Sequence, residues 1–184
     1  MSALFTTFAM LKTAGACVPR YRHLARALGG VRAYGENTPI TISTILDVNG
    51  FEDALWALRA TPAAQAAQRD RMARLFACWC VRRTPLADGR VTWDLLTDPR
   101  SRDAVEVAEK FAGGLATESQ LAAAWDAADA AWVAARAAAW AATGAAAGAA
   151  AGAAARAAAG AAAWDVARAV QTAEFASMLA EADE

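Results

Sequence analysis

The sequence predicts an all-α protein, in which an N-terminal bundle of short helices precedes a long alanine-rich C-terminal helix or helical hairpin. Before residue 113, apolar residues recur at helical spacing in short pieces that Gly and Pro interrupt. Between Ala122 and Ala163, 29 of 42 residues are alanine, the strongest helix former. We therefore expect a small helical domain over residues 1–114 and an Ala-rich helical segment over residues 117–184, which packs on that domain or mediates oligomerisation.

The first half of the chain contains three short predicted helices and one ambiguous segment. The helices run from Thr7 to about Gly15, over Pro19–Leu28 and over Phe51–Ala60. The segment Ile40–Val48 is either a helix that begins at a Thr38-Pro39 cap or, because several of its residues are β-branched, a short strand. Asn49-Gly50 breaks the chain before the next helix.

The second half of this domain is predicted to hold two longer helices. The clearer helix runs from about Pro62 to Arg83, with an Asp70–Arg74 pair on its surface. The other begins at Asp98-Pro99 and ends at Gly113-Gly114, with Ala104, Val105, Ala108 and Phe111 inward and Glu106 paired to Lys110 outward. The sequence leaves open which secondary structure the intervening apolar run, Val91–Leu96, adopts. The large apolar residues before Leu121 are expected to form one modest core: Phe5, Phe8, Leu11, Leu24, Leu28, Ile45, Leu46, Phe51, Leu55, Trp56, Leu58, Leu75, Phe76, Trp79 and Phe111.

The last helix is expected to start at Thr117, whose spacing to Gln120 is that of a capping box. From residue 132 to residue 168 every fourth residue is Trp, Arg or Gly, and the residues between them are mostly alanine. The three glycines within residues 143–152 weaken the helix, and we favour a break near Thr143-Gly144 that gives two antiparallel helices.

Composition and charge argue against several classes of partner. The net charge is −1 and the isoelectric point is about 5.9, so no positive field favours nucleic acid or an anionic membrane. The uncharged alanine stretch lacks the Leu, Ile, Val and Phe that drive membrane insertion, so no membrane span is expected. Three cysteines give no disulfide framework, and no signal peptide is expected, which indicates the cytoplasm.

The residues that carry chemistry do not form a catalytic or metal-binding pattern, so we expect no enzyme and no cofactor. His23 is the single histidine, and no nucleophile turn accompanies it. Cys78 and Cys80 point to different helix faces and have no second ligand pair, so they are expected to be buried apolar residues rather than zinc ligands. The carboxylate pairs, such as Glu106 with Glu109, are expected to be helix-surface charge.

Two surfaces remain as candidate binding sites. On the last helix the non-alanine side chains of residues 125–143 share one face, opposite a face of alanine alone. Trp and Arg dominate binding hot spots, so this face is either a partner site or a packing surface. The partner-binding candidates are Trp125, Asp126, Asp129, Trp132, Arg136 and Trp140. The candidates for anion binding are Arg20, Arg22, His23 and Arg26 on a basic helix face.

Four segments carry a resemblance to a known family. The block Ala73–Cys80, the segment Ser101–Trp125 and the alanine-rich tail that follows resemble Imm5-like immunity proteins and related bacteriophage accessory proteins. The segment Asp47–Ala60 is similar to the front of those phage proteins. The resemblance implies an all-helical antagonist without catalytic residues, which binds a toxin or inhibits a host defence such as a CRISPR or nucleotide-signalling system.

The leading hypothesis is therefore a non-enzymatic immunity or phage anti-defence inhibitor that binds a host defence protein or a toxin in the bacterial cytoplasm. The alternative is a sponge that sequesters a nucleotide-derived immune signal in a helical homo-oligomer. That alternative needs arginines and aromatic side chains to converge on a pocket, and Arg136, Arg156 and Arg168 beside Trp132, Trp140 and Trp164 could supply them.

Overall fold

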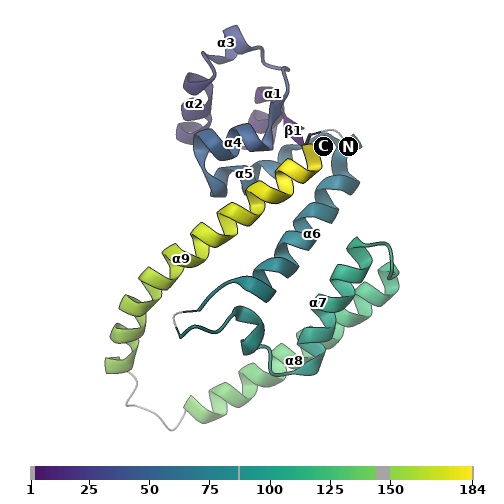
Figure 1. Cartoon of the computed structure of the whole chain (residues 1–184), viewed down its shortest axis with the longest axis vertical. Coiled ribbons are helices and arrows are strands. Elements are labelled where there is room, and N and C mark those ends of the chain that lie inside the picture. The colour runs from purple at the N-terminus through teal and green to yellow at the C-terminus, as the bar shows by residue number, and fades with distance from the viewer. Residues whose placement is uncertain (1–2, 87, 144–149, 184) are drawn as a thin grey trace. The chain divides into compact units, whose positions relative to one another are not determined.

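The all-α prediction is confirmed by the structure, a computed structural model (Figure 1). It describes the backbone of all residues except 1–2, 87, 144–149 and 184, and side chains except those of these residues and of 131–164 and 183. The described residues form nine α-helices, three short 3₁₀ helices and one two-stranded sheet. No helix in this part of the chain is long and apolar enough to cross a membrane.

The chain divides into two compact units. The N-terminal unit comprises residues 1–73 and 172–184, and the central unit comprises residues 74–171. This division differs from the boundary near residue 114 that the sequence suggested. Residues of the C-terminal end belong with the N-terminal helices, because Phe175 and Leu179 are fully buried there. The expectation of one core built before Leu121 was therefore wrong.

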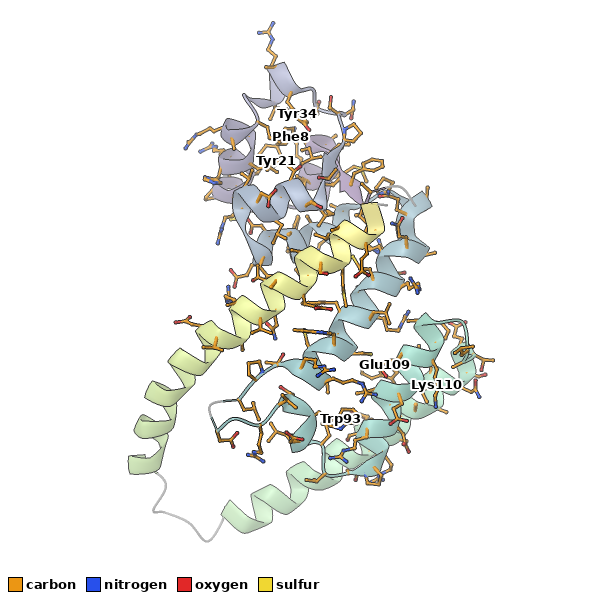
Figure 2. All side chains as sticks on the ribbon, in the orientation of Figure 1. Phe8, Tyr21, Tyr34, Trp93, Glu109 and Lys110 are labelled. Carbon is orange, nitrogen blue, oxygen red and sulfur yellow. The ribbon has the colours of Figure 1, made fainter. Side chains whose placement is uncertain are left out.

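The N-terminal unit begins with short elements whose ends follow the predicted signals. Helix α1 (Phe8–Thr13) is capped by Thr7, whose Oγ1 accepts a hydrogen bond from the Met10 N–H at 3.1 Å. Helix α2 (Val18–Ala27) carries Pro in its first turn and ends before Gly29-Gly30, and α3 (Val31–Tyr34) follows. The Phe8 ring is buried and makes edge-to-face contacts with Tyr21 and Tyr34, at centroid distances of 5.3 and 5.8 Å (Figure 2).

The ambiguous segment at residues 40–48 is both strand and helix. Strand β2 (Ile40–Thr41) pairs antiparallel with β1 (Phe5–Thr6), and α4 (Ile42–Asn49) starts directly after it. The cap of α4 is Thr41, which accepts from the Thr44 N–H, so the predicted cap at Thr38-Pro39 was wrong. The two-residue strand ends there because Thr41 is the helix cap, whose extended backbone and side-chain hydrogen bond begin α4.

Gly50 separates α4 from α5 (Phe51–Ala57), as predicted from Asn49-Gly50. Its φ of 86° is a left-handed value that glycine adopts without strain. The last predicted turn of this helix is the 3₁₀ helix η1 (Leu58–Ala60). The buried Thr6 hydroxyl donates to the Ala60 carbonyl at 2.6 Å, which ties β1 to η1. The helix predicted from Pro62 begins as the 3₁₀ helix η2 (Ala63–Gln65) and becomes α6 (Ala66–Arg83).

The central unit contains the second part of α6, the 3₁₀ helix η3 (Thr92–Leu95), α7 (Pro99–Ala112) and α8 (Glu118–Thr143). The ambiguous Val91–Leu96 run is thus mainly η3. Asp98 caps α7 through the Arg100 N–H, as predicted. Glu106 and Lys110 of α7 are exposed as expected, but among the described residues no ion pair joins them, so the predicted pair was wrong. The predicted Asp70–Arg74 pair was wrong, because Asp70 pairs with Arg69 at 2.7 Å while the Arg74 guanidinium lies 4.7 Å from the Phe111 ring centroid.

The last predicted helix is two helices, since α8 ends at Thr143 and α9 (Ala150–Asp183) begins seven positions later in the numbering. The expected break near Thr143-Gly144, and with it the form of the connection, falls on residues 144–149, outside the described residues.

Candidate interaction site

Helix α8, which carries the candidate site, has a start that side-chain hydrogen bonds define. The Thr117 N–H donates to Gln120 Oε1 at 2.8 Å, and the Gln120 N–H donates to Thr117 Oγ1 at 3.2 Å. This is the predicted capping box, which satisfies two backbone donors at the first turn. It fixes the first residues of α8.

Helix α8 packs against α7 through its small residues. The half-buried residues near its start are Leu121, Ala124, Ala127 and Ala128, which share one side of a helix, and Ala108 and Ala112 of α7 are buried. Alanine allows the two helices to approach closely because its side chain ends at Cβ. The alanine side of α8 is thus used within the unit.

The other side of α8 presents a large aromatic side chain to solvent. Trp125 is 64% exposed, and Asp126 and Asp129 beside it are exposed as well. Of the six predicted partner-binding residues, these three are placed by the structure on an open surface. Trp132, Arg136 and Trp140 belong to α8, but their side chains lie outside the described residues. We refer to Trp125, Asp126 and Asp129 as the α8 surface.

The basic face of α2 is partly used to hold the fold together. Arg20 Nη1 donates to the Asn49 carbonyl at 3.4 Å and lies 3.7 Å from Asp53 Oδ2. His23 Nε2 lies 3.1 Å from the Val48 carbonyl. Arg20 and His23 therefore fasten α2 to the end of α4, which makes them weaker candidates for anion binding.

The other two basic residues of that face, Arg22 and Arg26, are exposed, and within the described part of the chain they have no ion-pair partner. They remain candidates for anion binding, although among the described residues no hydrogen bond or ion pair brings further donors to them.

Sequence reasoning missed an arginine–tryptophan cluster in the central unit. The Arg82 guanidinium donates to both Glu109 carboxylate oxygens, at 2.6 and 2.8 Å, and lies 4.1 Å from the Trp93 ring centroid. Arg102 approaches the same indole at 5.3 Å. Figure 2 shows Trp93 and Glu109 within this region. No spacing signal could reveal the cluster, because its members come from α6, η3 and α7.

The cysteines differ strongly in environment. Cys17 is exposed, Cys80 is half-buried, and Cys78 is buried near the Val105 carbonyl. Burial raises the pKa of the Cys78 thiol above its usual range, and the nearby Glu109 carboxylate adds to this. Among the described residues, no group of His, Cys, Asp and Glu could hold a metal ion.

This contrast predicts the order of thiol reactivity. Because the thiolate is the nucleophile, we expect iodoacetamide at pH 8 to modify Cys17 at least about tenfold faster than Cys78 in the native protein. Peptide mass spectrometry over a time course measures both rates. Urea should bring the rates together, whereas equal rates in the native protein would contradict the buried position of Cys78.

Taken together, the helices and the exposed α8 surface define an all-α protein with a candidate protein-binding face. No family model, curated protein sequence or solved structure gives a significant match to the chain. The function must therefore be argued from the residues themselves.

Proposed function

We propose that the protein is a non-enzymatic inhibitor, an immunity or phage anti-defence protein that binds its target in the bacterial cytoplasm through the α8 surface. The observation that carries the proposal is the 64% exposure of Trp125. Exposing a large aromatic side chain forgoes the stabilisation that its burial would bring, whereas a partner with an apolar pocket recovers that stabilisation on binding.

The two neighbouring carboxylates indicate the kind of partner surface. Asp126 and Asp129 are exposed next to Trp125, so the partner is expected to offer an apolar pocket for the indole with Lys or Arg at its rim. Such rim charges mainly set the rate and specificity of association, while the central aromatic anchor supplies most of the affinity. The resemblance to immunity and phage accessory proteins supports a target among toxins and host defence proteins.

The test is protection in bacterial hosts that each carry one defence system or express one toxin. We expect the wild-type chain to raise phage plating efficiency, or toxin survival, in at least one such host. Trp125→Ala should abolish that effect, because losing a hot-spot tryptophan weakens binding by at least about 2 kcal/mol, roughly 30-fold.

The matched control for this variant is Leu115→Ala. Leu115 is an apolar residue of the same unit, 82% exposed and outside α8, so its removal should leave protection unchanged. Circular dichroism must show equal helix content in both variants. Protection that survives Trp125→Ala would refute the α8 surface, and a failure to protect in every host would refute the inhibitor.

A further inference from the structure

The N-terminal unit contains a cavity of about 290 Å³ where α2, α4 and α5 meet (Figure 1). The floor of the cavity consists of buried apolar residues, namely Leu11, Leu24, Ile45 and Ala57. Exposed residues surround its mouth, namely Gly15, Cys17, Arg20 and Glu52. The cavity is therefore open to solvent on one side and closed by apolar side chains on the other.

The volume of the cavity sets the size of its ligand. Ligand pockets are mostly apolar and span about 300–1,000 Å³, so this cavity stands at the lower end of the range. An apolar cavity of about 150 Å³ in another protein stays dry and binds benzene. At about 290 Å³, the cavity suits a compact apolar body of one or two rings.

The charged side chains that line the cavity already have partners. Arg20 Nη1 lies 3.7 Å from Asp53 Oδ2 and donates to the Asn49 carbonyl at 3.4 Å. Asn49 Nδ2 donates to Asp53 Oδ2 at 2.7 Å and to the Arg20 carbonyl at 3.0 Å, which joins the three helices. Glu52 is engaged in an interaction as well. A charged ligand would therefore have to displace an existing contact or give up its hydration without a new partner.

The walls between the floor and the mouth are aromatic and uncharged. Tyr21 and Trp56 line the cavity and are half-buried. Burial, with the nearby Glu36 carboxylate, raises the pKa of the Tyr21 phenol above its ordinary value, so the phenol is neutral near pH 7. The edge-to-face contact with Phe8 holds the Tyr21 ring in place (Figure 2). The cavity thus offers a preformed apolar surface, which a ligand would remove from water.

We propose that this cavity is a binding site for a small uncharged molecule with an apolar body of one or two rings. The body covers the floor formed by Leu11, Leu24 and Ile45, and a polar end, where the ligand has one, stays at the mouth beside Cys17. Removal of apolar surface from water supplies the affinity, and the paired charges at the mouth disfavour ions. The site lies in the N-terminal unit and depends neither on the α8 surface nor on the inhibitor function.

The first experiment compares three probes of nearly equal shape by isothermal titration calorimetry on the full chain at neutral pH: 3-phenylpropanol, 3-phenylpropylamine and 3-phenylpropionate. We expect saturable binding of the alcohol, at least about tenfold tighter than binding of the amine or the carboxylate, because only the alcohol enters without a charge to desolvate. The binding enthalpy of the alcohol should become more negative as the temperature rises, since burial of apolar surface lowers the heat capacity.

The second experiment locates the bound probe. Cys17 is exposed and lines the cavity, so saturating 3-phenylpropanol should slow its alkylation by iodoacetamide at least about threefold. Ala16→Phe adds a ring at the lining and should weaken binding of the alcohol at least about tenfold. The matched control is Ala27→Phe, which adds the same ring at an exposed position of α2 that does not line the cavity, and should leave binding unchanged. Thermal denaturation must show that both variants are folded.

Several outcomes would overturn the proposal. Binding of the amine or the carboxylate as tight as that of the alcohol would show that the cavity does not select against charge. The absence of saturable binding of 3-phenylpropanol would show that the cavity is no binding site for such a molecule. Binding that leaves Cys17 unprotected, or equal losses in Ala16→Phe and Ala27→Phe, would place the probe elsewhere. If Ala16→Phe failed to fold, protection of Cys17 in the wild-type chain would decide alone.

Discussion

Replacing Phe175 with alanine is expected to destabilise the N-terminal unit by about 3–5 kcal/mol, the usual cost of emptying a buried phenylalanine site. The Phe175 side chain is 0% exposed and meets the Phe51 ring edge to face, with a centroid distance of 5.6 Å and an interplanar angle of 85°. The substitution removes a ring from a core made of segments more than a hundred residues apart. Denaturation in urea, followed by circular dichroism, gives the free energy of unfolding.

The matched control is Val166→Ala, on the same helix. Val166 is 56% exposed, so its truncation should change the free energy of unfolding by less than about 0.5 kcal/mol. Hydrogen exchange identifies which part of the chain is destabilised, because Phe175→Ala should speed exchange in α4 and α5 more than in α7 and α8. If Phe175→Ala lowered the free energy of unfolding as little as Val166→Ala does, the result would contradict the placement of the C-terminal end in the N-terminal core.

Local signals in the sequence predicted the starts of α7 and α8 well. Asp98 and the Thr117–Gln120 pair each bond a backbone N–H within three residues, so the information is contained in a short window. The β2–α4 junction was missed because its cap, Thr41, is also the last residue of a strand. Pairing of that strand with β1 depends on residues more than thirty positions away.

The core could be predicted only in part, because it too depends on contacts between residues far apart in the sequence. Phe8, Leu24 and Ile45 were expected inside and are buried. Phe175 and Leu179 were not expected inside, because they follow an alanine repeat whose pattern does not indicate what the chain packs against after it. Leu55, expected in the core, is 38% exposed. Helical periodicity ranks the residues of a helix by face, but it does not say which helix from elsewhere in the chain covers that face.

The candidate binding residues also show that local patterns predict exposure on a helix but not contacts between distant segments. The exposure of Trp125 follows from its position on a helix whose other side is alanine, so the sequence could suggest it. The bond between His23 and the Val48 carbonyl joins residues 25 positions apart, and the Arg82–Glu109 pair joins residues 27 apart. Only the fold brings these groups together, and with them the cavity between α2, α4 and α5.

Glu109→Gln is expected to destabilise the central unit by about 1–2 kcal/mol. Hydrogen bonds to charged groups contribute about 1.5–3 kcal/mol, and we take less because both side chains are about one-third exposed, at 33% and 32%. The neutral amide keeps one acceptor oxygen and presents an NH₂ donor in place of the other, so it cannot reproduce the two-oxygen contact with Arg82. The guanidinium that stacks on Trp93 then loses its partner charge, so hydrogen exchange should accelerate in residues 84–97.

The pH dependence of the cost of Glu109→Gln gives a further test of the Arg82–Glu109 pair. Hydrogen bonding to Glu109 raises the pKa of the Arg82 guanidinium above its ordinary value. Folding therefore favours the charged form, and its contribution is full below the ordinary arginine pKa and is lost only as the pH rises through the raised value. The cost of Glu109→Gln should consequently be the same at pH 7 and pH 9.

The matched control is Glu106→Gln, one turn earlier on α7 and exposed, which changes the net charge equally but should cost less than about 0.5 kcal/mol. Equal costs for the two variants would mean that Glu109 acts through the negative charge of α7, to which Glu106 also contributes, rather than through its hydrogen bonds to Arg82. A large cost for Glu109→Gln alone would show that the pair holds Arg82 against Trp93.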